Sequence, residues 1–404
     1  MKVDFAELSL IEQVLDRQGG HIHAAQDYVR ARCTIDTGDL GFLLSGLEPL
    51  FRVAVDTAAD VLVRTNGLHT DAAAATAATL AAYVESERAT HEAVAAVTAL
   101  LGASSAPYAD PTSGLPSLGP AVSAASSGYG VAAPDALGLL PSSSTAFELA
   151  SESSAAVSGA MGAAERHADE WRGAGVAERS DASSYLVATH SGEDFVREMR
   201  WGAGVVLGSL DWVAEQFLGY SVLEEVVFKP FGGDWHALEE SSQAWSHAGR
   251  SLREVGVNVT GLPRQAAGWE GDAADRFAEA MVALGVAMTG IAMAFEFVSG
   301  LVTRVATVAK LACTGIAAIL KAISDKLARM LVEASIPIAG WIVAAAETVL
   351  LVNDIIKWIR RAFLLIDLVL GVISDFVKSR EQIVQAALLL DDLAAIATRR
   401  AVSA

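Results

Sequence analysis

The chain has 404 residues, of which 52% are hydrophobic and only 7% aromatic, and strand-type alternation is nearly absent. This composition predicts an all-α protein, and the length leaves room for two or three domains. The formal net charge of −19 argues against a nucleic-acid partner, because the chain has no basic patch that could offset phosphate charge.

Residues 1–101 are predicted to form a helical hairpin. Asp4 can cap a first helix that runs to about Arg32, in which Gly19 and Gly20 are expected to introduce a weak point or a kink. Apolar residues recur along this helix at helical spacing, and they are Leu8, Ile11, Leu15, Ile22, Ala25 and Val29.

The second helix of this hairpin is expected to be much longer than the first. Residues 36–41 have turn chemistry, and a helical pattern follows from Phe42 to about Leu101, in which Pro49 marks a kink or a late start. Near the end of this helix, Tyr83 and Glu87 are four residues apart, so they present an aromatic ring and a carboxylate side by side on one face.

Residues 102–144 form the clearest domain boundary in the chain. Six of the 10 prolines fall here among Ser, Gly and Ala, and no helical period is present. This composition predicts a disordered, flexible or extended linker. Residues 145–192 follow as a weakly structured helical connector, irregular from Ala174 to His190, and helical periodicity returns from Glu193 to Phe228.

The rest of the chain is organised around residues 268–277, whose sequence is Gly-Trp-Glu-Gly-Asp-Ala-Ala-Asp-Arg-Phe. They separate a helical pattern that stops near Val259, before the breaker cluster Thr-Gly-Leu-Pro, from one that starts near Asp272. The pattern predicts a hairpin within residues 193–300, with Trp269 and Gly271 in its turn and the indole covering its end.

Both helices of this second hairpin have an apolar face at spacings of three and four residues. Asp234 is expected to cap the first helix, whose face consists of Trp235, Leu238, Ser242, Trp245, Gly249 and Leu252. The face of the second helix consists of Phe277, Met281, Leu284, Met288, Ile291 and Phe295. Ala273 and Ala274 are small enough to let the neighbouring helix come close.

This pattern resembles the WXG family of type VII (ESX) secretion substrates, which are helical hairpins with Trp-x-Gly at the bend. The resemblance implies that Trp269 and Gly271 mark the bend, and that Tyr83 and Glu87 are the Tyr-x-x-x-Asp/Glu export signal of the family. The predicted secretion signal is therefore Tyr83, Glu87, Trp269 and Gly271. Its recognition by the type VII secretion ATPase is implied with it.

The resemblance covers about residues 193–297 and, more weakly, residues 3–101. Two further matches exist: Trp171-Arg172-Gly173 for the bend, and Tyr220 with Glu224 for the signal, which stays open as the alternative to Tyr83 with Glu87. Type VII export needs no cleaved signal peptide, and the N-terminus has no basic region followed by an apolar core. We therefore expect a secreted or cell-surface protein.

The two halves of the signal lie in different predicted hairpins. A linker of roughly 40 residues spans on the order of 35 Å, which lets one hairpin fold back on the other at high effective concentration. We expect an internal pseudo-heterodimer in which residues 42–101 pack beside residues 234–297, with Tyr83 on the side of Trp269. The competing arrangement is a free N-terminal hairpin that recruits a separate small WXG-like partner.

The C-terminal region, residues 301–404, is predicted to consist of hydrophobic helices. The longest uncharged stretches near it, residues 280–295 and 334–346, are shorter than the roughly 18 residues of a membrane span. We expect a buried core or a partner surface. Conditional membrane contact through residues 280–376, with a helical bend at residues 335–341, is the alternative. A last amphipathic helix is expected at about residues 380–398.

No catalytic pattern is visible in the chain. We find no nucleophile elbow, phosphate-binding glycine loop or His-Glu-x-x-His spacing, and the two cysteines, Cys33 and Cys313, are predicted to be buried thiols. We therefore expect a non-enzymatic effector without a cofactor or metal, acting through helical assembly. The alternatives are a membrane-active or pore-forming effector and a chaperone or adaptor for a separate toxin.

Overall fold

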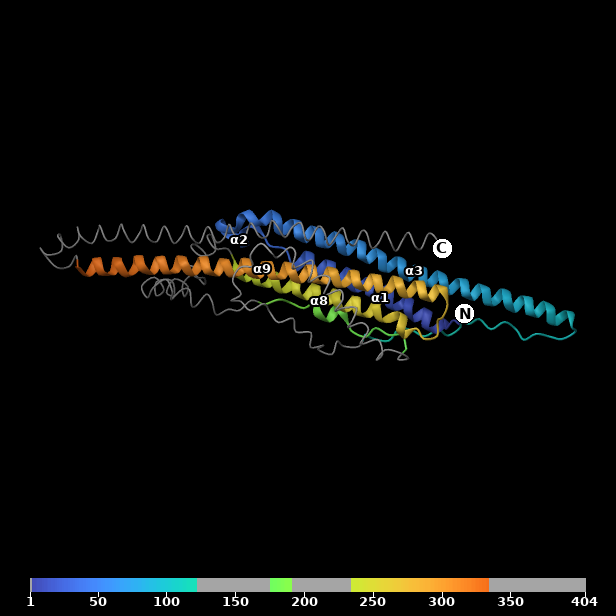
Figure 1. The fold of residues 1–404 in the computed structure, drawn as a ribbon. Helices are drawn as coiled ribbons and strands as arrows, with labels where there is room; N and C mark the ends of the chain where they lie inside the picture. Colours follow the sequence, from blue (N-terminus) through green and yellow to red (C-terminus); the bar gives the residue numbers. More distant parts are fainter. Residues whose placement is uncertain (1, 122–174, 191–233, 334–404) are drawn as a thin grey trace.

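A computed structural model describes residues 2–121, 175–190 and 234–333. In Figure 1 these residues form an elongated bundle of long helices. They contain no strand, only an isolated β-bridge between Lys2 and Glu270, so the predicted all-α class is confirmed.

Several sequence predictions fall outside the described residues. These are the helical patterns at residues 145–171, 193–228 and 380–398, the bend at 335–341, and the alternative matches Trp171-Arg172-Gly173 and Tyr220 with Glu224. They stay predictions.

The first hairpin begins with α1 (Phe5–Arg32), which is capped as predicted. The Asp4 carboxylate accepts hydrogen bonds from the backbone N–H groups of Ala6 at 2.9 Å and Glu7 at 3.1 Å. All six apolar positions predicted for this helix are fully buried. The expected face is therefore confirmed.

The expected kink at Gly19 and Gly20 is not present, because α1 continues through both residues. A Cβ atom on Gly19 would lie only 2.9 Å from Asn66 Oδ1 on the next long helix, so Gly19 serves a close helix contact. His69 is fully buried in the same contact, with Nδ1 2.9 Å from the Thr65 carbonyl oxygen. Burial lowers the pKa of His69 to about 4, so its side chain is neutral at neutral pH.

The connection from α1 to the second long helix is itself partly helical. It consists of α2 (Thr37–Leu44) and the 3₁₀ helix η1 (Ser45–Leu47). The predicted turn at residues 36–41 is therefore largely wrong: Asp36 and Asp39 form a capping box that starts a helix there, and only Gly41, at φ +60°, breaks it. α3 (Glu48–Leu100) starts with Pro49 in its first turn, so Pro49 marks the late start.

The second hairpin consists of α8 (Trp235–Gln265) and α9 (Asp272–Glu333). Asp234 caps α8 as predicted, accepting from His236 N at 3.0 Å. The predicted end of this helix near Val259 is wrong, because α8 continues through Pro263. The proline lies in the last turn, where it removes one backbone hydrogen bond, and burial of the apolar Leu262 side chain favours the helical conformation there.

α8 and α9 pack at close range through glycines. A Cβ atom on Gly285 of α9 would lie 1.8 Å from Thr260 Oγ1 and 3.0 Å from the Gly256 carbonyl oxygen of α8. Ala273 and Ala274 were expected to allow the close approach, but Ala273 is exposed and Ala274 is only partly buried. The glycines allow the close approach instead. The predicted apolar faces of both helices are buried or partly buried against the core.

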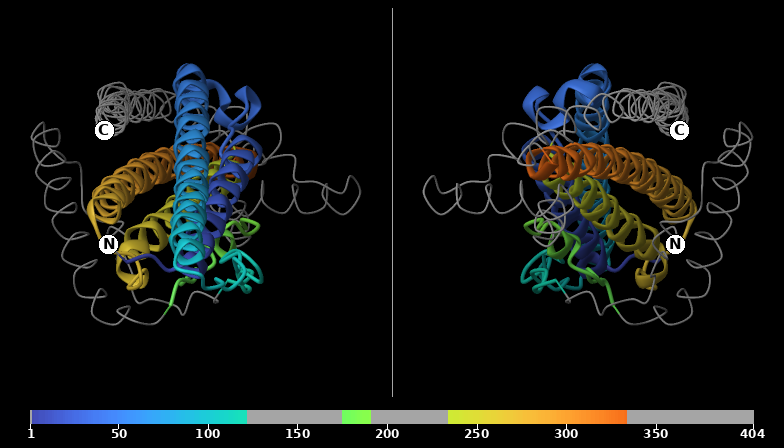
Figure 2. Two further views of the ribbon diagram at one scale, coloured as in Figure 1. Left: turned by 90° about the vertical axis from the view of Figure 1, so that its right-hand side faces the viewer. Right: turned by 90° about the vertical axis from the view of Figure 1, so that its left-hand side faces the viewer.

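The bundle has α1 and α8 in its centre. Figure 2 shows the four long helices from their ends: α3 packs on α1, α1 packs on α8, and α8 packs on α9. The two hairpins pack on each other within the chain, and Tyr83 lies on the side of Trp269, as predicted. The predicted packing of residues 42–101 beside residues 234–297 is largely wrong. Instead, α1 makes most of the contact with α8, whereas residues 42–101 were expected to do so.

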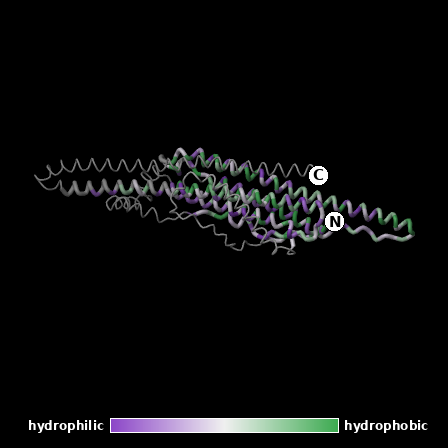
Figure 3. Tube along the Cα trace, viewed as in Figure 1, coloured by the Kyte–Doolittle hydropathy of each residue, from purple (hydrophilic) through white to green (hydrophobic). Residues whose placement is uncertain are grey.

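Two helices project beyond the bundle at opposite ends, α3 at one end and α9 at the other (Figure 1). The far end of α3 is hydrophobic (Figure 3) and exposes Val94, Val97, Leu100 and Leu101. The first part of the predicted linker, residues 102–121, runs back extended along α3 and α1. It is held there by hydrogen bonds such as Leu118 N to Gln13 Oε1 at 2.7 Å.

The close α8–α9 contact can be tested with two glycine substitutions on the same helix. Gly285→Ala should lower the free energy of unfolding by about 1–3 kcal/mol, because the methyl group overlaps Thr260 and the α8 backbone. Gly290→Ala is the control: its Cβ would meet no atom within 4 Å, so higher helix propensity should raise stability by roughly 0.5–1 kcal/mol. Urea unfolding measures both, and equal effects would contradict the packing.

Candidate recognition surface at the Trp-x-Gly turn

The turn between α8 and α9 requires glycine at two positions for different reasons. Gly271 has φ +122°, a conformation that strains any residue with a side chain. Gly268 is needed for space, since a Cβ atom there would lie 2.5 Å from Asp4 Cβ and 2.8 Å from Glu7 Oε2. The turn therefore depends on backbone freedom at one end and on close contact with the N-terminus at the other.

The N-terminal segment holds this turn in place. Lys2 and Glu270 exchange two backbone hydrogen bonds, of 3.4 Å and 2.9 Å, and Glu7 Oε2 accepts from Gly268 N at 2.6 Å. Burial raises the pKa of Glu7, and the bond from Gly268 offsets part of that effect. The middle residue of Trp269-Glu270-Gly271 is thus tied to the start of the chain.

Trp269 covers the end of the hairpin, as predicted. Its side chain is 7% exposed, and its ring lies 5.2 Å from the Phe277 ring between centroids. Its Nε1–H donates to the Tyr83 hydroxyl at 3.3 Å. Tyr83 belongs to the other hairpin, so two predicted signal residues 186 positions apart in sequence are in direct contact.

Glu87 lies one turn further along α3 and is exposed. The returning segment 102–121 passes close by, where Tyr108 donates to the Val84 carbonyl oxygen at 3.4 Å. Partial desolvation, together with the charges of Asp110 and Glu87, raises the pKa of Tyr108. The surface around the turn therefore combines a half-buried tyrosine, a buried tryptophan and an exposed carboxylate. We call these three residues with Gly271 the composite surface.

Sequence reasoning missed the residues that support the composite surface. These residues are Lys2, Glu7 and Gly268. They lie at opposite ends of a long segment, and Glu7 and Gly268, which contact each other, are 261 positions apart. No local pattern indicates such a pairing. Only the Asp4 cap, which starts α1 next to the turn, was visible in advance.

The described residues offer little else for chemistry. In that part of the chain no group of three His, Cys, Asp or Glu side chains could hold a metal ion. Cys33 and Cys313 are buried thiols and are not joined in a disulfide, as predicted. Burial raises the pKa of both, to about 12 for Cys313, which disfavours the reactive thiolate.

Comparison of the chain with protein-family models, with curated proteins and with solved structures finds no match.

A double-mutant cycle can test the contact between Tyr83 and Trp269. Tyr83→Phe removes the acceptor and Trp269→Phe the donor, so the double variant should lose less stability than the sum of the two single variants. We expect a coupling of about 0.5–1.5 kcal/mol in urea unfolding. Tyr108→Phe combined with Trp269→Phe is the control and should be additive, whereas additivity for Tyr83 as well would contradict the contact.

Proposed function

We propose that this protein is a non-enzymatic effector and a substrate of a type VII (ESX) secretion system, exported as a folded helical bundle. One observation carries the proposal: Trp269 donates a hydrogen bond to Tyr83, so one residue from each half of the proposed signal meets the other across the two hairpins. The resemblance of the Trp-x-Gly bend and the Tyr-x-x-x-Glu face supplies the rest of the argument.

In this proposal the two hairpins of one chain take the places of the two partners in a WXG pair. α1 packs on α8, and apolar residues of both helices, such as Leu15, Ile22 and Val255, are fully buried. Pairing within one chain occurs at high effective concentration, so a separate small WXG-like partner is not required for this surface to form.

The secretion ATPase would recognise the composite surface of the folded chain. α3 projects past the turn beyond Tyr83, which leaves Glu87 and the following turns accessible to a partner (Figure 1). The proposed destination is the cell surface or the medium. Action after export would proceed through assembly of helical surfaces.

Export can be tested by comparing culture filtrate with cytosol, in cells with and without the secretion ATPase. Tyr83→Ala and Glu87→Ala should each leave the protein folded and retain it in the cytosol, because each removes one group of the composite surface. Circular dichroism of the purified variants checks the fold.

Glu92→Ala is the matched control, since it removes an exposed carboxylate from the same helix, one turn beyond the signal. It should be exported like the parent chain. Unchanged secretion of both Tyr83→Ala and Glu87→Ala would contradict the assignment, and the Tyr220 and Glu224 pair would then be the next candidate.

A second candidate function, a membrane-active effector, is favoured by one feature of α9. The stretch Asp272–Thr307 is long and apolar enough to cross a membrane by length and composition, and its mean hydropathy is 1.9. Only 44% of its most apolar window is buried, although core helices also have this composition. Leakage of dye-loaded vesicles on addition of the full chain at neutral pH would favour this candidate over the first.

A further inference from the structure

The described residues between the two hairpins, 175–190, lie as a strap along α1 and α8. The strap is extended except for the 3₁₀ helix η2 (Ala182–Tyr185) and runs antiparallel to α8. Ala177 N donates to Gln265 Oε1 at 2.9 Å near one end of α8, and His190 contacts Gln243 near the other. Figure 2 shows the strap, in green, on the outside of the α1–α8 pair.

The strap is anchored by a buried glutamate. The Glu178 side chain is 1% exposed and accepts hydrogen bonds from three residues of one face of α1. Arg17 Nη1 lies 3.0 Å from Oε2, while Gln18 Nε2 at 3.0 Å and His21 Nε2 at 2.6 Å contact Oε1. Burial alone would raise the pKa of Glu178, but these three bonds outweigh it and lower the pKa.

The backbone of the strap is bound by side-chain amides of α8. Asn258 Oδ1 accepts from Arg179 N at 3.0 Å and Ser180 N at 3.2 Å, while its Nδ2 donates to the Ser180 carbonyl oxygen at 2.8 Å. Gln243 binds the backbone of one strap residue in the same way. Its Nε2 donates to the His190 carbonyl oxygen at 2.9 Å, and its Oε1 accepts from His190 N at 3.4 Å.

This combination is how grooves bind extended peptides. Amide side chains form hydrogen bonds with the backbone of a peptide of any sequence, and one charged pocket makes binding specific for one side chain of the peptide. Tyr28 adds a further backbone contact, as its hydroxyl donates to the Val187 carbonyl oxygen at 2.7 Å. Other strap side chains also contact the bundle: Val176 and Ala182 are buried in the core, and Ser180 Oγ donates to Glu254 Oε2 at 2.6 Å. Val187, by contrast, is half exposed.

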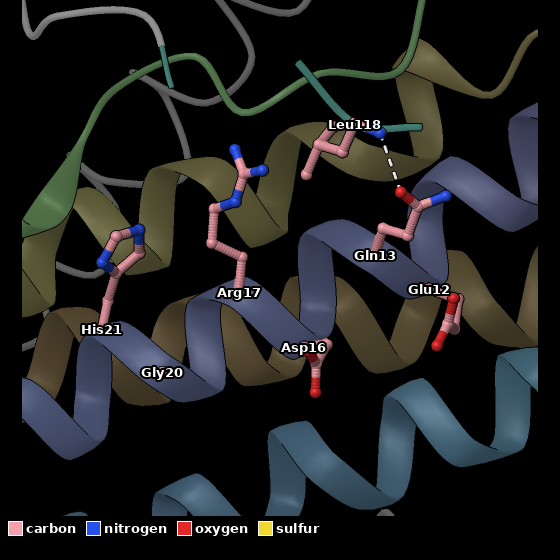
Figure 4. A pocket seen from close by; sticks show the side chains of 7 residues that line it. All are labelled: Glu12, Gln13, Asp16, Arg17, Gly20, His21 and Leu118. Atoms are coloured by element: carbon pink, nitrogen blue, oxygen red, sulfur yellow. Dashed lines mark hydrogen bonds between the residues drawn. The ribbon is translucent and has the colours of Figure 1, made fainter. Parts of the chain in front are cut away.

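The pocket that binds Glu178 is itself closed, since that side chain is only 1% exposed. An open groove of about 480 Å³ adjoins it and is lined by Gln13, Arg17, His21 and Leu118, among others. Figure 4 shows Gln13, Arg17 and His21 on the side of α1 where Leu118 lies, with Glu12 and Asp16 on the other side. Arg17 and His21 line this groove and also bind Glu178, so two of the three residues that hold the anchor are next to solvent.

We propose that the cleft between α1 and α8 is a peptide-binding site that selects a glutamate-anchored extended segment, and that residues 175–190 occupy it as an internal ligand. The occupant in cis is this strap, and the same segment of a second copy can take its place. The glutamate side chain is bound by Arg17, Gln18 and His21. The backbone of the segment is bound by Asn258, Gln243 and Gln265.

The test uses the full chain and a fluorescent peptide with the sequence of residues 175–190. Glu178→Lys in the full chain places an ammonium group against the Arg17 guanidinium, so the strap should leave the cleft. The peptide should then bind this variant in fluorescence anisotropy. It should bind the parent chain at least tenfold more weakly, because the strap in cis competes at high effective concentration.

Two further peptides test selectivity on the same full-length variant. A peptide carrying Glu178→Gln should bind at least tenfold more weakly, because its amide NH₂ would face the donors of α1 and the charge-assisted bonds would be lost. A peptide carrying Val187→Ala should bind like the parent peptide. Equal binding of the Gln peptide, or no binding of any peptide, would overturn the proposal.

Hydrogen exchange of the parent chain gives an independent measurement if Glu178→Lys does not fold. The amides of Ala177, Arg179, Ser180 and His190 should be protected in the parent chain, and Glu178→Gln should expose all four together. Exchange of these amides in the parent chain at the rate of a free peptide would overturn the proposal.

Discussion

The packing of α1 against α8 is the contact on which the other features of the bundle depend. α3 packs on α1 and α9 packs on α8, so each outer helix is placed relative to the other hairpin through this central pair. Without it, Tyr83 and Trp269 would belong to separate bodies, and the strap would have only one wall to bind. The hydrophobic effect stabilises this contact, since apolar residues of both helices, such as Leu15 of α1 and Val255 of α8, are fully buried.

Apolar packing alone does not determine how far α1 is shifted along α8. Apolar residues recur on both helices at spacings of three and four residues, so a shift of one turn can place one apolar side chain where another was. The buried polar contacts remove this freedom: Asn258 Nδ2 donates to Gln18 Oε1 at 3.2 Å, and Gln18 in turn donates to Glu178. A shift of one turn would leave these groups buried without partners, which costs more than the apolar contact would regain.

The elements that were predicted from the sequence are those determined by nearby residues. The caps Asp4 and Asp234 and the apolar faces of α1, α8 and α9 depend on residues within a few turns, and the structure has them as expected. The errors have a different origin. Pro263 and Gly19 were judged by helix propensity, whereas burial of Leu262 and the contact with Asn66 decide the structure at these positions.

The candidate site was predictable to the same extent. Tyr83 and Trp269 each belong to a short pattern, so they could be found and their proximity expected from the pairing of hairpins. Glu178 belongs to no pattern, and its partners Arg17 and Gln18 lie 161 and 160 positions away in the chain. Contacts at such separation depend on the assembled bundle, and a single sequence contains no local signal for them.

The contact between Trp269 and Tyr83 is too weak to hold the two hairpins together. A single hydrogen bond of this kind contributes about 1 kcal/mol, far less than burial of the α1–α8 interface. The Trp269–Tyr83 contact is therefore a consequence of the hairpin pairing and an indicator of it. The indole and the phenol meet only when α1 lies in register on α8 and the N-terminus closes the turn. Under the proposed function, a secretion ATPase that recognises the composite surface would distinguish the paired bundle from a chain with separated hairpins. Export would then be coupled to completion of the fold through the geometry of one end of the bundle.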